Sequence, residues 1–217
     1  MKNAIITGGQ SYHQNFFTNQ NGKYKNFFNK RIYILDLEDV ELKDFDYLVL
    51  SSRLNLSYLF KNKHKLESYL DNGGNIVSFG EIKKPLFRNI HWQDYPTNFW
   101  WWVLEGSDLP LYAKDMKHQL FKFLDVDECK WHYHGAFYPP TGSEEILVNE
   151  IGESIIYKDT ISYKGSLYVT SLDPDYHIGQ GFMPKTVPFF DKFMAWVESD
   201  ITKKSLAKNE KSLKETL

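Results

Sequence analysis

The sequence predicts an α/β fold, with a flavodoxin-like, doubly wound and mostly parallel sheet and helices on both of its faces. Two observations support this prediction. In the first 80 residues, four short apolar runs are separated by helical or long connections, a pattern that favours parallel strands over hairpins. Nearer the C-terminus, three more apolar runs are separated only by turn residues, which predicts a β-meander.

The first half of the chain supplies the parallel part of the predicted sheet. Its apolar runs end in glycines, serines or acidic residues, as buried strands do, and they cover residues 4–7, 31–37, 47–50 and 75–79. Between the last two runs, residues 55–71 carry apolar side chains at approximately helical spacing, and Gly73 and Gly74 follow as a stop signal. A helix is therefore predicted there.

The second half begins with an aromatic, aperiodic stretch over residues 91–102, which predicts an insertion packed over the carboxyl edge of the sheet. Residues 131–140 (WHYHGAFYPP) predict a strand, and the meander follows at 144–150, 153–159 and 166–172. Residues 188–201 place aromatic side chains on one helical face, which predicts a helix that covers the sheet. We therefore expect one domain over residues 1–201 and a polar C-terminal tail over 202–217.

Composition narrows the kinds of partner. The formal net charge of −2, from 26 basic and 28 acidic residues, produces no field that would attract nucleic acid or an anionic membrane. No apolar run approaches the roughly 18 residues that span a bilayer, and residues 1–9 lack the apolar core of a signal peptide. We expect a cytoplasmic protein whose partner is a small-molecule ligand, with no nucleic acid and no membrane; a homo-oligomer is left open.

The densest group of chemically active side chains follows the last predicted strand. Residues 167–181 (LYVTSLDPDYHIGQG) run from an apolar strand into a predicted loop that carries Asp173, Asp175, Tyr176 and His177. Open α/β sheets build their sites where such strands end. His177 and Asp175 are therefore candidate catalytic residues, and Tyr176 is a candidate ligand-binding residue; the alternative is a well-tied loop without a function.

Glu81 is a further candidate, because it follows the fourth strand at a predicted strand-to-helix turn, where a helix N-terminus can hold a carboxylate ionised. It could act as a general base, a metal ligand or an acceptor for a sugar hydroxyl, or it could simply cap the next segment. Arg53, after the third strand, could stabilise negative charge at the same edge.

Two histidines suggest a metal alternative. His132 and His134 flank Tyr133, and in a strand this spacing places both imidazoles on one face. They could bind zinc or another divalent ion, with His177 or Asp175 as a third ligand, or they could hydrogen-bond backbone at a sheet edge. A pattern such as HExxH is absent. No cofactor is predicted, and a divalent metal remains an alternative.

Two residues extend the predicted pocket. Gly9 lies in Gly8-Gly9-Gln10-Ser11 after the first strand, which lacks the GxGxxG spacing of a dinucleotide loop and predicts a tight turn at the same sheet edge. Trp101 belongs to the aromatic insertion, whose flat rings could form the rim of a binding site or could pack against the sheet.

The order of these pieces resembles the class I glutamine amidotransferase-like proteins and, within them, the trehalose-utilisation-like (ThuA-like) branch. The resemblance covers about residues 1–201 and is carried by DYLVLSS, YLDNGGNIVSFGE, WHYHGAFYPP and GSLYVTSLDPDYHIG. It implies a nucleophilic cysteine at the turn after the fourth strand and a histidine near the final strand. Here Gly80-Glu81 occupies that turn, and the single cysteine, Cys129, lies in a charged segment elsewhere. Glutaminase activity is therefore not expected.

Two functions remain open. The first is a non-glutaminase protein of this fold that binds a small polar metabolite or carbohydrate; its pocket would be formed by Gly9, Arg53, Glu81, His134, Asp175 and His177. The second is a hydrolase or isomerase in which Glu81 or His177 acts as the base and a metal or Arg53 stabilises developing charge. The sequence does not choose between them.

Overall fold

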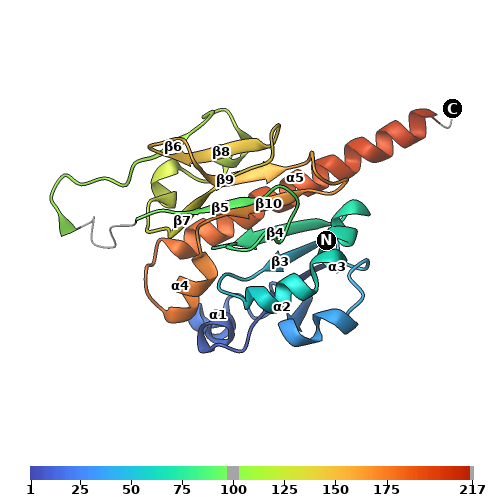
Figure 1. The fold of residues 1–217 in the computed structure, drawn as a ribbon, viewed down its shortest axis with the longest axis horizontal. Helices are drawn as coiled ribbons and strands as arrows, with labels where there is room; N and C mark the ends of the chain where they lie inside the picture. Colours follow the sequence, from blue (N-terminus) through green and yellow to red (C-terminus); the bar gives the residue numbers. More distant parts are fainter. Residues whose placement is uncertain (97–102, 216–217) are drawn as a thin grey trace.

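The computed structural model describes residues 1–96 and 103–215, except for the side chains of 208, 209 and 211–215. In this part of the chain ten strands form one sheet, flanked by helices on both faces (Figure 1). The strand order is β2-β1-β3-β4-β10-β9-β7-β5, and β8 and β6 extend the sheet from β9. Parallel pairing from β2 to β10 gives way to antiparallel pairing beyond it. The predicted fold class is confirmed.

Buried apolar runs form the parallel part of the sheet, which consists of β1 (Asn3–Thr7), β2 (Lys30–Tyr33), β3 (Tyr47–Leu50), β4 (Asn75–Phe79) and β10 (Leu167–Thr170). The predicted strands 47–50 and 75–79 coincide with β3 and β4. The prediction of a strand over 31–37 was too long, because a 3₁₀ helix, η1 (Ile34–Asp39), follows β2. Its buried residues, Ile34 and Leu37, are three apart, which is the period of a 3₁₀ helix and not of a strand.

The helices divide between the two faces of the sheet. On one face lie α2 (Leu56–Lys61) and α3 (Lys63–Asp71); on the other lie α1 (Ser11–Gly22), α4 (Pro174–Gln180) and α5 (Thr186–Glu215). The single helix predicted over 55–71 is in fact two helices. Asn62 separates them, because its backbone N–H bonds back to Leu59 and Phe60 as the C-cap of α2.

The predicted meander forms the antiparallel part of the sheet, with β8 (Glu144–Asn149) and β9 (Ser154–Asp159) leading into β10. The remaining antiparallel strands are β5 (His91–Asp94), β6 (Leu111–Ala113) and β7 (Gly135–Tyr138). The start of the insertion is thus the strand β5, paired with β7. Trp101 lies outside the described residues.

The strand predicted over 131–140 begins only at Gly135, so His132 and His134 precede it. Trp131, His132 and Tyr133 are buried in succession, whereas a half-exposed strand alternates between buried and exposed positions. Spacing of two residues therefore does not place the two imidazoles on one face of a strand here.

The last helix, α5, covers the sheet as predicted, with Phe189, Phe193 and Trp196 buried against it. It continues to Glu215, so most of the region expected as a tail, 202–217, is helical. Residues 202–207 are exposed, and Figure 1 shows this end of α5 projecting away from the sheet.

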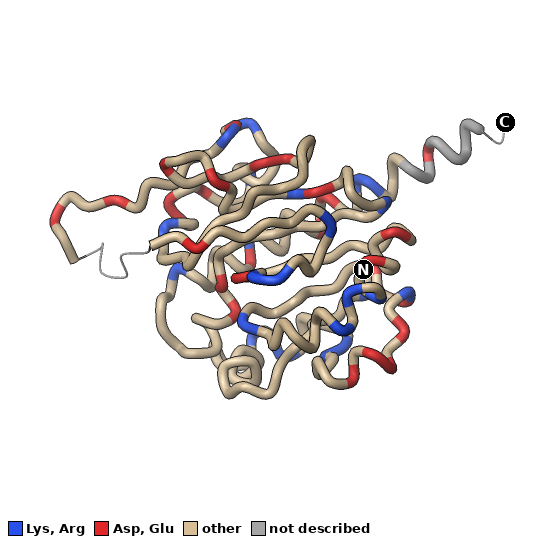
Figure 2. The backbone as a smooth tube through the Cα atoms, in the orientation of Figure 1, with Lys and Arg blue, Asp and Glu red and all other residues tan. Residues whose placement is uncertain are grey.

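Charge and hydropathy agree with the sequence. Basic and acidic residues are interspersed along the described chain (Figure 2). Across the described residues, each helix is too short or too polar to cross a membrane.

Candidate functional site at the carboxyl edge of the sheet

The turn after β4 brings three strand ends together. Gly80 adopts a left-handed conformation, with φ of +76°, and a Cβ added there would lie 2.8 Å from the Cβ of Ser52, just beyond β3. The N–H of Gly80 also bonds to the carbonyl oxygens of Thr170 and Leu172 at 2.9 and 3.0 Å. The ends of β3, β4 and β10 are therefore held close together.

Glu81 follows this turn, but the helix predicted after it does not form. Residues 81–90 have no helical turn; they run as a loop whose apolar side chains Ile82, Leu86 and Phe87 are buried in the core. Pro85 also disfavours helical backbone at the preceding residue. Glu81 therefore does not lie at a helix N-terminus, and that reason for its carboxylate being held ionised was wrong.

The segment after β10, predicted as a loop, contains a short helix. Pro174 occupies the first turn of α4, where its missing N–H costs nothing, and Gly181 ends the helix with φ of +75°. Asp173 at the N-cap and His177 are four residues apart, so both side chains lie on one side of the helix. His177 Nε2 is 3.2 Å from Asp173 Oδ1, and both side chains are buried.

Arg53 binds the other oxygen of this carboxylate. Its Nε and Nη2 donate to Asp173 Oδ2 at 3.1 and 2.9 Å, and its guanidinium lies 3.8 Å from the centre of the Tyr176 ring. Arg53 has a φ of +55°, an uncommon left-handed backbone for a residue with a Cβ. Burial by itself would raise the pKa of Asp173, but His177 and Arg53 lower it below its ordinary value.

A partly exposed chain of side chains continues outward from Arg53. Nη2 donates to His134 Nε2 at 3.0 Å, and His134 Nδ1 is 3.8 Å from Glu81 Oε1. Glu81 Oε2 in turn lies 3.2 Å from Lys83 Nζ. The side chains of Arg53, His134 and Glu81 are 31%, 25% and 25% exposed, so they form the rim of the cluster. Burial lowers the pKa of His134.

His132 lies deeper than His134. Its ring centre is 4.6 Å from that of His177, and burial followed by the proximity of His177 lowers the pKa of His132 to about 4. His132, Asp173 and His177 place one potential ligand atom each within 4.8 Å of the others, a set that could hold a metal ion. Of the metal ligands predicted from the sequence, His132 and His177 belong to this set, whereas His134 and Asp175 do not; Asp173, which was not predicted as a ligand, does.

Asp175 contacts Ser52 and lies near His13. Its Oδ2 accepts a hydrogen bond from Ser52 N at 2.9 Å, and it lies near His13, whose Nε2 donates to Ser52 O at 2.9 Å. Burial raises the pKa of Asp175. These contacts join α4 and α1 to the end of β3, and a catalytic role for Asp175 stays a prediction.

Gly9 lies beside Tyr33, because a Cβ placed on it would lie 3.3 Å from Tyr33 Oη. Its neighbour Gly8 donates its N–H to His13 Nδ1 at 3.1 Å. The turn predicted after the first strand is therefore present, while ligand binding by Gly9 stays a prediction.

Cys129 lies at the end of a 3₁₀ helix, η4 (Val126–Cys129), and is fully buried in the core. Burial raises the pKa of its thiol well above the ordinary value. We predict that native protein at pH 8 reacts with a thiol reagent such as dithionitrobenzoate at least about tenfold more slowly than protein in urea, since only the thiolate attacks. Equal rates in the two states would show that Cys129 is accessible.

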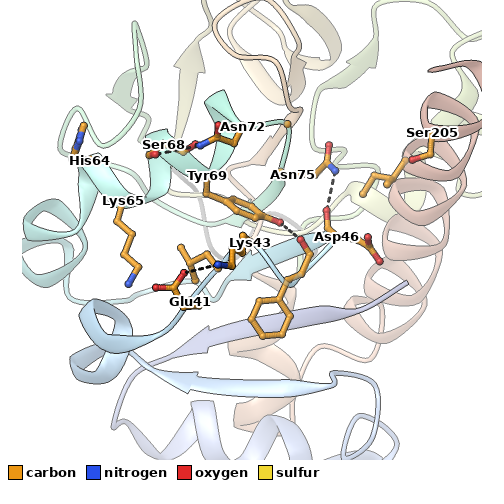
Figure 3. Close-up of a pocket in the computed structure, with 15 residues that line it drawn as sticks. Glu41, Lys43, Asp46, His64, Lys65, Ser68, Tyr69, Asn72, Asn75 and Ser205 are labelled. Carbon is orange, nitrogen blue, oxygen red and sulfur yellow. Dashed lines mark hydrogen bonds and ion pairs between the residues drawn. The ribbon is translucent and has the colours of Figure 1, made fainter. Parts of the chain in front are cut away.

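A second hollow lies at the opposite edge of the sheet. A cavity of about 600 Å³ is formed where β3 and β4 begin, with Asp46, Tyr69 and Asn75 among its lining residues (Figure 3). Tyr69 Oη donates to Phe45 O and Asn75 Nδ2 to Asp46 O, so these polar groups stabilise the loops that form the cavity. The convergent histidines and acids lie at the carboxyl edge instead, which is where open α/β folds bind ligands.

Comparison with known proteins shows a likeness of fold to solved structures. No protein-family model matches the chain, and neither does any curated protein. A putative GMP synthase subunit from Thermoplasma acidophilum is 12% identical, with a TM-score of 0.57 over 94% of this chain and 98% of that one.

Two other similar structures have a TM-score of 0.49. One is a glutamine amidotransferase of Thermotoga maritima, 10% identical over 94% of this chain and 85% of that one. The other is a putative ThuA-like protein of Bacteroides uniformis, 14% identical over 90% of this chain and 91% of that one. At these identities the likeness concerns the fold alone: the chain shares the overall fold of the putative GMP synthase subunit of Thermoplasma acidophilum.

Proposed function

We propose that the protein binds a small polar metabolite or carbohydrate at the carboxyl edge of the sheet and has no glutaminase activity. The observation that carries this proposal is the rim of Arg53, His134 and Glu81, which is partly exposed and is anchored to the buried carboxylate of Asp173. A guanidinium held at a fixed position is already oriented for a ligand, so less entropy is lost on binding.

The chemistry of the rim suits oxygen-rich ligands. Arg53 uses Nε and Nη2 on Asp173, and a guanidinium has five N–H donors, so others can bind hydroxyl or carboxylate oxygens. Glu81 can accept from a hydroxyl group, and the Tyr176 ring supports the guanidinium from one side. A neutral polyol, a sugar or a small hydroxy acid matches these groups.

The cysteine content supports the absence of glutaminase activity. The reaction needs an activated thiolate, and the resemblance to the amidotransferase-like proteins implies that it would lie at the turn after the fourth strand. The sequence has one cysteine, the buried Cys129, and the turn after β4 carries Gly80 and Glu81. Without a nucleophile at this turn, His177 has no acyl transfer to assist.

A hydrolase or isomerase is the second candidate, and one observation favours it. His134 Nδ1 and Glu81 Oε1 lie 3.8 Å apart at the rim, where an acid and a base could act on one ligand. A ligand bound there without turnover would argue for the binding function alone.

The experiment is a melting-temperature screen of the purified full chain with neutral sugars, sugar acids, polyols and dicarboxylates. At least one of these classes is expected to raise the Tm of the wild type. Replacing Arg53 by glutamine should weaken binding of that compound about tenfold or more, because hydrogen bonds to a charged group are lost.

Arg88→Gln is the matched control, since Arg88 pairs with Asp71 at the surface outside the cluster and its loss should leave binding unchanged. A screen in which no class raises the Tm, or an Arg53→Gln protein that binds as well as the wild type, would refute the proposed function.

We propose that the partner of the protein is a small-molecule ligand and neither nucleic acid nor a membrane. We also propose that the protein is cytoplasmic. A homo-oligomer stays open; sedimentation of the full chain measures it directly.

A further inference from the structure

We propose that His132, Asp173 and His177 form a binding site for one divalent transition-metal ion beneath the rim. Two imidazoles and one carboxylate are a common ligand set for zinc and for other first-row divalent ions, and they leave coordination positions open. In the described part of the chain, one potential ligand atom from each of the three residues lies within 4.8 Å of the others. The inference does not depend on the identity of any organic ligand.

The separation of two of these atoms fits a shared ion. His177 Nε2 and Asp173 Oδ1 are 3.2 Å apart. Two atoms that each bind one ion at about 2.1 Å, at an angle of about 100°, are separated by about that distance. The approach across one turn of α4, which is also that of a direct ion pair, therefore leaves the two atoms at a separation that a common ion can bridge.

Buried polar atoms in the cluster also support a bound metal ion. Within the described residues, His177 Nε2 and Asp173 Oδ1 approach each other at 3.2 Å without the geometry of a hydrogen bond, and His177 Nδ1 has no hydrogen-bond partner. His177 is 0% exposed and Asp173 is 2% exposed. Buried polar atoms without partners are costly, so these atoms call for a partner inside the cluster, and a cation would be one.

The surroundings also resemble those of a metal site. Arg53 holds Asp173 through Oδ2 and leaves Oδ1 directed at His177, as an outer-shell group orients a ligand carboxylate. Trp131 and Phe182 pack against the His177 ring in T-shaped arrangements, with ring centres 5.4 and 4.7 Å away. Such an apolar shell fixes the imidazole and limits access of water.

The test is titration of the tag-free, chelator-treated full chain with Zn²⁺ and, separately, with Co²⁺. Calorimetry is expected to show one ion per chain, and bound Co²⁺ should show the visible absorption of an ion coordinated by protein nitrogen and oxygen. His132→Ala and His177→Ala should each weaken Zn²⁺ binding by at least about tenfold, since losing even an outer-shell partner costs that much.

His64→Ala and His91→Ala are the matched controls, because both histidines are exposed. Asp173→Asn is measured beside the histidine variants, and circular dichroism checks that each variant folds, since His177 is fully buried. A wild-type chain that binds neither ion overturns the site. Binding that is unchanged in the His132 and Asp173 variants overturns it too, because the ion then lies elsewhere.

Discussion

Replacing Asp173 by asparagine is expected to lower the free energy of unfolding by about 3 kcal/mol, the lower end of the range for a broken buried ion pair. The substitution keeps the shape of the side chain but removes the charge that Arg53 and His177 face. Arg53 is 31% exposed and can regain some water, which places the effect at that lower end. Urea denaturation at pH 7 with a chelator present measures it.

Asp71→Asn is the control for this substitution. Asp71 also accepts two hydrogen bonds from an arginine, Arg88, but at the surface, where water replaces them. Its effect should be much smaller than that of Asp173→Asn. Equal effects would show that burial of the Arg53–Asp173 pair contributes little.

Acid should reduce the difference in free energy of unfolding between the wild type and Asp173→Asn. The pKa of Asp173 in the folded protein is below its ordinary value, so the unfolded state binds the proton more tightly. The stabilisation by this carboxylate is therefore complete above about pH 4 and is lost as the pH falls below that value. Denaturation curves of both proteins at pH 7 and pH 3 measure the change.

Replacing Gly179 by alanine is expected to cause a second large loss in the free energy of unfolding. In most helices this change is favourable by up to about 1 kcal/mol. Here α4 packs so closely on α1 that the new Cβ would lie 2.1 Å from the carbonyl oxygen of Tyr12. We expect a loss of about 2 kcal/mol, as for an overpacked core, because backbone and not a flexible side chain has to move.

Ala195→Gly, at an exposed position of α5, serves as the control. It should cost about 1 kcal/mol, the ordinary helix preference for alanine. If Gly179→Ala instead left the protein as stable as the wild type or more so, α1 and α4 would not be in close contact. The orientation of Asp173 and His177 on α4 would then need another explanation.

Much of the fold could be predicted from the sequence because buried parallel strands are continuous apolar runs. Strands β3 and β4 coincide with their predicted ranges for this reason. Residues 34–39 could not be separated from β2, because Ile34 and Leu37 extend the apolar run but face the core at helical spacing. Short apolar runs do not distinguish the two periods.

That Arg53, Glu81 and His177 lie at one edge of the sheet could also be predicted, since each of them follows a strand whose carboxyl end lies there. Which of these side chains pair with one another could not be predicted. Arg53 and Asp173 are 120 residues apart, and which oxygen Arg53 binds depends on the left-handed backbone at Arg53 and on helix α4. The four-residue spacing of Asp173 and His177, together with Pro174 and Gly181, was the pattern in the sequence from which α4 could have been predicted.

Nuclear magnetic resonance of the seven histidine side chains in the full chain, recorded as Zn²⁺ is added, shows whether the carboxyl-edge cluster is the functional site. The imidazole nitrogen signals of His132 and His177 are expected to shift together until one equivalent is bound, while those of the exposed His64 and His91 stay unchanged. Shifts confined to His64 or His91, with the signals of His132 and His177 unaffected, would show that the carboxyl-edge cluster is not the functional site.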